Sequence, residues 1–393
     1  MKVLLLEDSE EKRKVVVELL GKFQDQNLDI TVVDNFTDYL RNINSILFDL
    51  LIVDLVVPQY RNSNNAIEMT TQIMEVTRGD YKCVNFRTAA VALTGYDTTA
   101  EERIKDLNLH DITVLTYDVD VDDWKKSLEK KIVSSAPKPN FDFVIICALP
   151  KEADGFAAAG YPVSNRTLIA GLSCREIQIN RKRGVIVTAP RMGLVSAAIT
   201  ATHAIDAFSP KYLCMSGICA GVKNRTKIYD VLISSTCHQN DSGKWSSGHF
   251  QTEVYSVPLD HGISLKVDEM ISERNFAENI SSNIKLSLDE FPPETNNLEF
   301  SVILAPTSSG SSVIADENMV DQIGGQQRKL MGFEMEAFAI YEAARLSTRN
   351  IKVICAKSVV DNGTPGKGDS YHRVAAILSA KVIYECIAND CLE

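Results

Sequence analysis

The chain has 393 residues, of which 45% are hydrophobic and 24% are charged, and its formal net charge is -11 at pH 7. At about 150 residues per domain, this length predicts two or three domains with sizeable cores. The negative charge argues against sequence-independent binding to nucleic acid or to an anionic membrane, and no apolar run reaches the ~18 residues that would span a bilayer.

The nine cysteines are scattered along the chain, and no CxxC pair occurs. Cys147, Cys214 and Cys355 fall within apolar runs, which is typical of reduced core residues. The Met1-Lys2-Val3 start does not look like a secretory leader. We therefore expect a cytoplasmic protein.

The first third of the chain alternates between apolar runs and segments of helical periodicity. The predicted strands are residues 2–6, 30–33, 48–53, 89–93 and 112–115, and the predicted helices are 10–20, 36–46, 66–77, 99–107 and 122–131. Five such βα units predict a five-stranded parallel sheet with helices on both faces.

Polar residues follow three of these strands. Glu7 and Asp8 end the first strand, Asp54 ends the third and Thr94 ends the fourth. Because the carboxyl ends of parallel strands meet at one edge, we expect an acidic pocket there. Clustered carboxylates bind Mg²⁺, and the metal would let Asp54 attack a phosphoryl donor despite its charge.

These residues, in this order, resemble the receiver domain of two-component response regulators over residues 1–133. The resemblance implies a flavodoxin-like fold, Glu7, Asp8 and Asp54 as Mg²⁺ ligands, Asp54 as phosphoacceptor and Thr94 as switch hydroxyl. It also implies a sensor histidine kinase or phosphotransfer protein as partner. The sequence departs from the family at one position. The family carries a lysine before a proline at the end of the fifth strand, whereas residues 115–118 here read Leu-Thr-Tyr-Asp and contain no lysine. A degenerate, purely structural receiver is therefore the alternative.

Residues 134–140 contain two prolines and small polar residues, so they predict a linker. The pattern then restarts, and we expect a second domain over residues 141–393. Its predicted strands are 141–149, 173–180, 184–189, 212–215, 230–235 and 353–360, and a predicted alanine-rich helix covers 195–208. The stretch 239–298 is more polar and irregular.

Acidic residues flank a predicted helix and strand near the end of the chain. Glu334 and Glu336 precede a helix whose buried stripe includes Ala337 and Ile340, and Asp361 follows the strand 353–360. These two groups of carboxylates are expected to converge on one pocket. Alternatively, Glu336 only complements the helix dipole, and Asp361 only caps a turn.

Two glycine-bearing turns are expected after strands in this domain. They are Arg191-Met192-Gly193 and 215–221, which includes Gly217. Glycine lets backbone approach a ligand closely, although tight packing of small residues would explain both turns equally well.

Taken together, Ala148–Glu152, the two glycine turns, Phe333–Glu336 and Ser358–Asp361 resemble the purine nucleoside phosphorylase and nucleosidase superfamily, and most closely the methylthioadenosine/S-adenosylhomocysteine nucleosidases. The resemblance implies a mixed central sheet. It also implies that Glu336 holds the ribose hydroxyls with Met335 against the sugar, that Asp361 protonates the purine and that Glu152 activates water. The implied substrate-contacting set is Glu334, Met335, Arg191, Met192, Gly193, Gly217, Val313 and Lys357.

Two residues depart from the closest relatives. Val313 replaces the aromatic residue that stacks on adenine, and Ile218 stands where a small hydroxyl residue is usual. Lys357, four residues before Asp361 on the same strand, is expected to orient Glu152 or the water.

A receiver joined to a nucleosidase resembles the ATP-nucleosidase effectors of Detocs anti-phage phosphorelays. The resemblance implies hydrolysis of ATP to adenine and ribose 5′-triphosphate, without a cofactor for that step, in a homo-oligomer. We expect Arg191 to meet the 5′ phosphates. The alternatives are a small-nucleoside nucleosidase, a purine nucleoside phosphorylase, and a phosphorylation-dependent binding module without activity.

Overall fold

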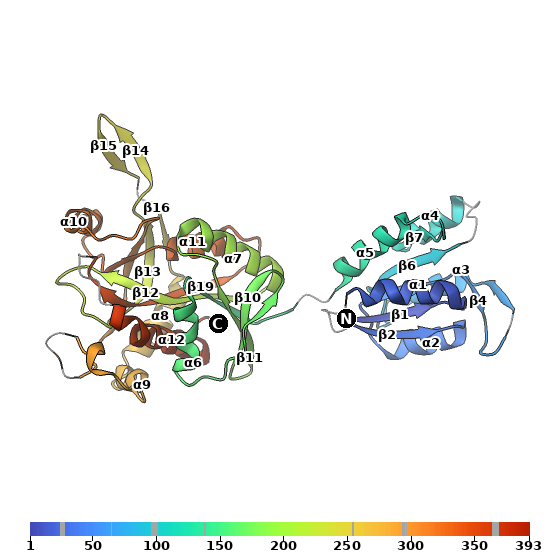
Figure 1. The fold of residues 1–393 in the computed structure, drawn as a ribbon, viewed down its shortest axis with the longest axis horizontal. Coiled ribbons are helices and arrows are strands. Elements are labelled where there is room, and N and C mark those ends of the chain that lie inside the picture. The colour runs from blue at the N-terminus through green and yellow to red at the C-terminus, as the bar shows by residue number, and fades with distance from the viewer. Residues whose placement is uncertain are drawn as a thin grey trace. The chain divides into compact units, whose positions relative to one another are not determined.

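The computed structural model describes residues 1–23, 28–63, 65–95, 101–136, 139–253, 255–292, 295, 297–363 and 369–393. The chain divides into two compact units, Met1–Lys138 and Pro139–Glu393 (Figure 1). This division lies within the expected linker 134–140, of which residues 137 and 138 are outside the described residues. Residues 99 and 100 of the expected fourth helix are also outside them.

The N-terminal unit is built on a five-stranded parallel sheet in the order β2-β1-β3-β6-β7. The strands are β1 (Lys2–Leu6), β2 (Asp29–Val33), β3 (Leu50–Val53), β6 (Ala89–Thr94) and β7 (Ile112–Thr116). The expected five-stranded parallel sheet is confirmed, and the strand order is that of flavodoxin-like folds.

Helices cover both faces of this sheet. They are α1 (Glu10–Gly21), α2 (Phe36–Ser45), α3 (Thr70–Met74), α4 (Glu101–Leu109) and α5 (Asp123–Ser135). Val3 and Leu5 of β1 point into a core shared with α1 and α5, whereas Leu4 and Leu6 point into a core shared with α2 and α3. The near-continuous apolar run of β1 is explained by burial on both faces.

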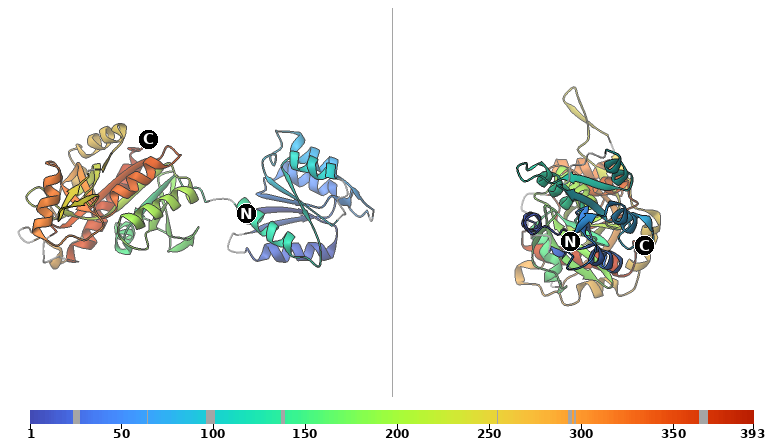
Figure 2. Two further views of the ribbon diagram at one scale, coloured as in Figure 1. Left: turned by 90° about the horizontal axis from the view of Figure 1, so that it is seen from above. Right: turned by 90° about the vertical axis from the view of Figure 1, so that its right-hand side faces the viewer.

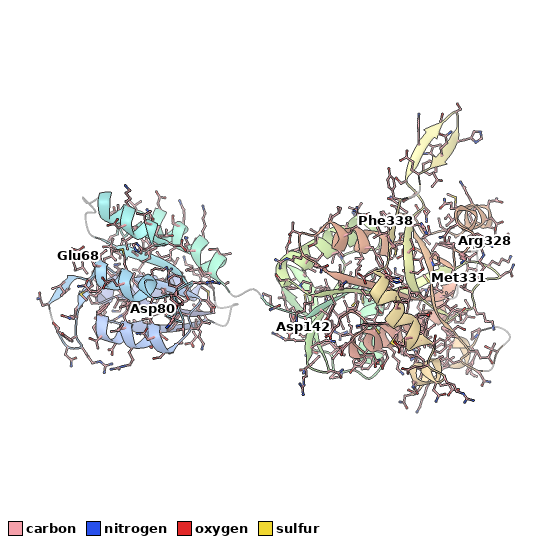
Figure 3. The ribbon with its side chains drawn as sticks, turned by 180° about the vertical axis from the view of Figure 1, so that it is seen from behind. Glu68, Asp80, Asp142, Arg328, Met331 and Phe338 are labelled. Carbon is pink, nitrogen blue, oxygen red and sulfur yellow. The ribbon has the colours of Figure 1, made fainter. Side chains whose placement is uncertain are left out.

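The expected helix 66–77 is partly wrong. Ala66–Glu68 forms strand β5, which pairs antiparallel with β4 (Val56–Pro58), and the helix begins only at Thr70. It continues from Met74 into a π-helical turn, Glu75–Gly79. Figure 3 shows Glu68 on β5 at the margin of the unit. The hairpin forms because the β-branched Val56 and Val57 favour extended backbone opposite residues 66–68.

The C-terminal unit contains a mixed sheet, as expected, and this sheet has ten strands. Its order is β16-β13-β17-β18-β12-β8-β11-β10-β9, and β19 pairs with β12 and β13. The strands are β8 (Phe143–Cys147), β9 (Thr167–Ile169), β10 (Leu172–Ile179), β11 (Lys182–Thr188), β12 (Tyr212–Gly221), β13 (Val231–Gln239), β16 (Tyr255–Pro258), β17 (Val302–Ser309), β18 (Gly332–Glu334) and β19 (Lys352–Asp361).

Seven α-helices surround this sheet in the described part of the unit. They are α6 (Pro150–Ala158), α7 (Leu194–Phe208), α8 (His261–Ile271), α9 (Phe276–Ser281), α10 (Glu317–Gln326), α11 (Ala337–Leu346) and α12 (His372–Ala388). α12 packs against α6 and against β12 and β19, and α11 packs against α7. The contact between α6 and α12 is very close at Gly155, where a Cβ atom would lie 2.5 Å from the carbonyl oxygen of Ala376.

The expected irregular stretch 239–298 holds β16, α8, α9 and a separate hairpin. The hairpin consists of β14 (Gly243–Ser246) and β15 (His249–Thr252), and it projects from the unit in two views (Figures 1 and 2). Trp245 is exposed on it and contacts Phe250, with 5.3 Å between the ring centroids. Within the described residues, none of the helices combines the length and apolar character that crossing a bilayer requires.

Candidate active site

A cavity of about 260 Å³ in the C-terminal unit brings most of the predicted site residues together. It lies at the carboxyl ends of β12 and β19 and at the amino ends of α6, α11 and α12, which is where α/β sheets bind ligands. The predicted residues that line it are Glu152, Met192, Val313, Glu334, Met335, Glu336 and Asp361, together with Ile218. Arg191 is exposed and is not among the lining residues.

Glu152 sits in the first turn of α6 and is 2% exposed. Its carboxylate accepts hydrogen bonds from the backbone N–H of Leu149 at 2.9 Å and from that of Ile218 at 3.0 Å. Burial raises the pKa of Glu152 to about 7, against the opposing effect of the Lys357 ammonium. A carboxyl group that changes its charge near neutral pH suits proton transfer.

Gly217 positions this carboxylate. Residues 215–221, expected as a turn, belong to strand β12, which continues to Gly221. A Cβ atom on Gly217 would lie 2.5 Å from Glu152 Oε1. Glycine is therefore required at this point so that α6 can bring Glu152 against the strand.

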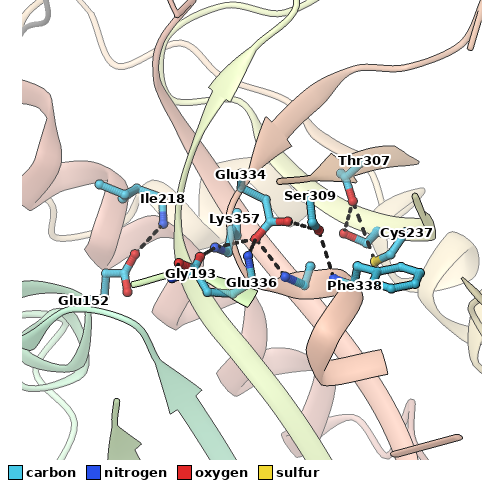
Figure 4. A network of polar contacts seen from close by, with 12 residues as sticks. Glu152, Gly193, Ile218, Cys237, Thr307, Ser309, Glu334, Glu336, Phe338 and Lys357 are labelled. Atoms are coloured by element: carbon cyan, nitrogen blue, oxygen red, sulfur yellow. Dashed lines mark hydrogen bonds and ion pairs between the residues drawn. The ribbon is translucent and has the colours of Figure 1, made fainter. Parts of the chain in front are cut away.

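Lys357 joins two carboxylates beneath the cavity (Figure 4). Its Nζ lies 2.7 Å from Glu334 Oε2 and 2.6 Å from Glu336 Oε2, and all three side chains are buried. Burial would lower the pKa of Lys357, but the two glutamates raise it well above its usual value. Burial would raise the pKa of Glu334, but Lys357 and the hydrogen bonds to this carboxylate hold it below its usual value. Lys357 and Glu334 therefore form a buried ion pair.

The two glutamates differ in how many protein donors they bind. Glu334 accepts from the Ser309 hydroxyl, from Lys357 and from the backbone N–H groups of Glu336 and Ala337, so it fixes the start of α11. Glu336 accepts from Lys357 and from the N–H of Gly193 at 2.9 Å. Glu336 thus keeps acceptor capacity for a ligand hydroxyl pair.

Asp361 ends β19, where the pairing with β12 shifts register between Cys219 and Ala220. Its Oδ1 accepts from the N–H of Gly363 at 2.8 Å, which is the turn-capping bond that the alternative interpretation expected. Asp361 is half-buried and also lines the cavity. The two interpretations are therefore compatible.

Lys151 and His372 also line the cavity, although sequence reasoning did not select them. The Lys151 Nζ and His372 Nδ1 atoms are in direct contact, and His372 Nδ1 lies 3.5 Å from Asp369 Oδ1. The position of Lys151 next to Glu152 could have pointed to it. His372 is 221 residues away from Lys151 in the chain, and only the packing of α12 on α6 reveals it.

The N-terminal unit holds a second cluster of polar groups. Carboxylate oxygens of Glu7, Asp8 and Asp54 lie within 4.8 Å of one another, and Thr94 lines the same depression as Asp8 and Asp54. Three converging carboxylates are the oxygen donors that Mg²⁺ prefers, so these residues fit such an ion. Burial raises the pKa of Glu7, although Lys12 opposes this effect.

Lys12 of α1 enters this cluster, which sequence reasoning did not anticipate. Its Nζ lies 2.6 Å from Asp54 Oδ2 and 2.7 Å from Glu7 Oε2. The contact with Asp54 spans 42 residues of sequence, so no local pattern announces it.

Comparisons with known proteins concern mainly the C-terminal unit. The family described as the phosphorylase superfamily matches residues 142–386. The 5′-methylthioadenosine/S-adenosylhomocysteine nucleosidase of Desulfotalea psychrophila is 25% identical over 55% of this chain and 88% of its own length. The ATP nucleosidase Cap17 of Escherichia coli is 19% identical over 50% of this chain, but only 40% of its own length is covered.

Further similarities are to a protein that matches along nearly the whole chain and to solved structures. An uncharacterized protein of Sinorhizobium fredii, y4jS, is 24% identical over 97% of both chains, so it is similar to both units. Among solved structures, futalosine hydrolase and 5′-methylthioadenosine/S-adenosylhomocysteine nucleosidase, both from Helicobacter pylori, align with TM-scores of 0.50 at 15% identity. They cover 63% and 64% of this chain and 97% and 99% of their own length. The matched part of this chain therefore has the same fold as these two structures.

Proposed function

Because the chain belongs to the phosphorylase superfamily, we propose that its C-terminal unit is a nucleosidase that hydrolyses the N-glycosidic bond of a purine nucleotide. The proposed substrate is ATP, and the products are adenine and ribose 5′-triphosphate. The observation that carries this proposal is the convergence of Glu152, Glu336 and Asp361 on one cavity. These carboxylates supply the proton acceptor, the sugar contact and the proton donor that the reaction needs.

The chemistry follows from these positions. The C1′–N9 bond breaks as the sugar becomes oxocarbenium-like, and the bonding electron pair passes to the purine, which Asp361 protonates at N7. Water bonds to C1′ from the other side of the ring, and Glu152 accepts its proton. Glu336 accepts hydrogen bonds from the ribose hydroxyls, with Met335 against the sugar. Lys357 donates a hydrogen bond to Glu336 and so fixes its position, in which the Glu336 side chain lies close to the positive charge that develops on the sugar.

Hydrolysis is favoured over phosphorolysis by the charge of the cavity. Phosphate as nucleophile would have to approach the anomeric carbon beside Glu152 and Glu336. The Lys357 ammonium is already bound by Glu334 and Glu336, so it does not offer a separate phosphate site. We therefore assign water as the nucleophile beside Glu152, and we assign the cations of the cavity wall, Lys151 and His372, to phosphates of the substrate itself.

A triphosphate tail needs cationic partners, since burying phosphates without them costs several kcal/mol. In the described part of the chain, the basic side chains that line the cavity are Lys151 and His372. Both lie at helix starts, where the positive ends of helix dipoles favour anions. The similarity to Cap17 points the same way. Arg191 does not line the cavity. Its predicted contact with the 5′ phosphates therefore stays a prediction.

A small-nucleoside nucleosidase is the second candidate. Met192, Met335 and Ile218 give the cavity an apolar side, and the relative from D. psychrophila matches over most of its length. A phosphorylase or an inactive binding module would not require all three carboxylates.

We further propose that the N-terminal unit is a receiver that regulates this activity. Glu7, Asp8 and Asp54 would hold Mg²⁺, which supplies charge neutralisation for phosphoryl transfer to Asp54, and Thr94 would act as the switch hydroxyl. The phosphoryl group would come from a sensor histidine kinase or a phosphotransfer protein. A role in anti-phage defence and a homo-oligomeric state complete the proposal.

One experiment separates the candidates. The purified chain is incubated with ATP, adenosine, methylthioadenosine or NAD, with and without acetyl phosphate, and free base is quantified by chromatography. Adenine release from ATP above that from the other substrates supports the proposal, and stimulation by acetyl phosphate supports the receiver. A preference for methylthioadenosine or adenosine would favour the second candidate, and no release from any of the four would contradict a nucleosidase.

A further inference from the structure

Lys12 is a buried cation at the centre of the acidic cluster in the N-terminal unit. It is 5% exposed, and its ammonium contacts Asp54 Oδ2, Glu7 Oε2 and the carbonyl oxygen of Leu93, each at 2.6 or 2.7 Å. The Nζ also lies 5.4 Å from the centre of the Tyr117 ring. Three strong acceptors and one aromatic face thus fix the position of this charge.

The sequence lacks the lysine that receivers carry after the fifth strand, and Tyr117 follows β7 there. A phosphoryl group on Asp54 would bring a charge of about -2 into a pocket that already holds Glu7 and Asp8. Such a group needs a cation besides the metal, because unpaired charge in a partly buried site is costly. The Lys12 ammonium already lies 2.6 Å from Asp54 Oδ2, next to the place where the charged phosphoryl oxygens would be added.

We propose that Lys12, presented by helix α1, supplies the ammonium that positions and neutralises the phosphoryl group on Asp54. This inference rests on the proposed receiver function. In the transfer from acetyl phosphate, an Asp54 oxygen forms a bond to phosphorus, the bond from phosphorus to the acetate oxygen breaks, and acetate leaves with the bonding electron pair. Lys12 changes partner from the carboxylate to a phosphoryl oxygen and remains protonated.

The position of Lys12 has a second consequence for magnesium. Lys12 pairs with two of the three carboxylates that would hold the ion. Removing its charge therefore makes the pocket more negative and should increase the affinity for Mg²⁺. If Lys12 only took the place of the metal ion, removing its charge would also increase the affinity for Mg²⁺, but it would not slow the phosphorylation of Asp54.

The test uses the full chain with Lys12→Met, Lys12→Arg or Lys14→Met. Lys14 is a matched control, because it lies on the same helix, its side chain is exposed, and its Nζ pairs with Glu10 Oε1 at 2.7 Å on the surface of that helix. Phosphoryl incorporation from acetyl phosphate is measured at saturating Mg²⁺. The Mg²⁺ affinity is measured by the fluorescence of Trp124, which contacts Tyr117, in a Trp245→Phe background.

We expect Lys12→Met to incorporate phosphoryl groups on the order of 10²-fold more slowly, as for loss of one charge-stabilising donor at a reacting group, and to bind Mg²⁺ more tightly. Tighter binding would also show that the pocket remains folded. Lys12→Arg should keep incorporation within about tenfold of the unchanged chain, and Lys14→Met should match it. Incorporation by Lys12→Met at the original rate would overturn the proposal, and so would loss of both incorporation and Mg²⁺ binding, which indicates a purely structural role.

The outcome is distinguishable from failure of the proposed function. Adenine release without a phosphodonor reports on the C-terminal unit alone. If the unchanged chain takes up no phosphoryl group at Asp54, the receiver proposal and the role of Lys12 are both wrong, while the nucleosidase proposal stands or falls on adenine release.

Discussion

Glu152 is held by two backbone N–H groups at the wall of the cavity, and its side chain is almost completely buried. Glu152→Gln keeps the volume of this side chain, but it cannot accept a proton and it loses one of the two backbone hydrogen bonds, because its NH₂ group is not an acceptor. Glu152→Gln and Asp361→Asn should each lower the rate of base release by ~10²–10⁴-fold, with both variants still folded at the assay temperature. The measurement is adenine release at saturating substrate, and wild-type turnover in both variants would contradict the site assignment.

The raised pKa of Glu152 predicts a pH dependence. A general base must be deprotonated, so activity should rise as pH increases through about 7 and should fall about tenfold per pH unit well below it. Glu152→Asp, with a lower ordinary pKa, should move this limb to lower pH if it retains activity. If the pH dependence came instead from titration of the substrate's phosphates, the limb would stay at the same pH in this variant. The pH profile of kcat/KM from pH 5 to pH 9 checks both points.

The cations at the cavity wall predict substrate selectivity. Lys151→Met should weaken hydrolysis of ATP by about tenfold or more and leave hydrolysis of adenosine nearly unchanged, since only ATP presents phosphates. Arg191→Met removes a basic residue outside the lining and serves as the comparison. If Arg191→Met loses more ATP hydrolysis than Lys151→Met while keeping adenosine hydrolysis, Arg191 is the residue that binds the phosphates, as the sequence predicted. Equal losses on both substrates would favour the small-nucleoside interpretation.

At the scale of elements, the close approach of α6 to β12 fixes the base. A methyl group on Gly217 would fall within 2.5 Å of Glu152 Oε1 and would displace that carboxylate. Gly217→Ala should therefore lower kcat by about 10²-fold, since small misplacements of catalytic groups have effects of this size. Gly325→Ala in α10, where an added methyl meets open space, is the control. Steady-state kinetics with a thermal-melt check would test this prediction, and an unchanged kcat would contradict it.

Apolar runs predicted most strands of both sheets because parallel strands are buried on both faces. The β4–β5 hairpin escaped prediction because residues 66–68 are exposed and carry no apolar alternation. The carboxylates were predictable because they follow strands, and strand ends converge in this fold class. Lys12 and His372 were not, because each reaches its site through helix packing between segments far apart in the sequence.

For the whole molecule, the proposed regulation depends on one oxygen of Asp54. Asp54→Ala should abolish the response of adenine release to acetyl phosphate and leave the basal rate unchanged, because Asp54 belongs to the N-terminal unit and the cavity to the other. The ratio of rates with and without phosphodonor is the measurement. A response that persists in Asp54→Ala would mean that the N-terminal unit is a structural receiver and that regulation comes from elsewhere.

The contact between Gly155 and Ala376 has a consequence for natural variation. Any side chain at position 155 would collide with the backbone of α12 and push apart α6 and α12, whose first turns carry Lys151 and His372. A missense change in the Gly155 codon should thus yield an inactive allele, although the altered residue does not line the catalytic cavity. Genetic screens for loss of function should recover such alleles at this codon as readily as at the codon of Glu152.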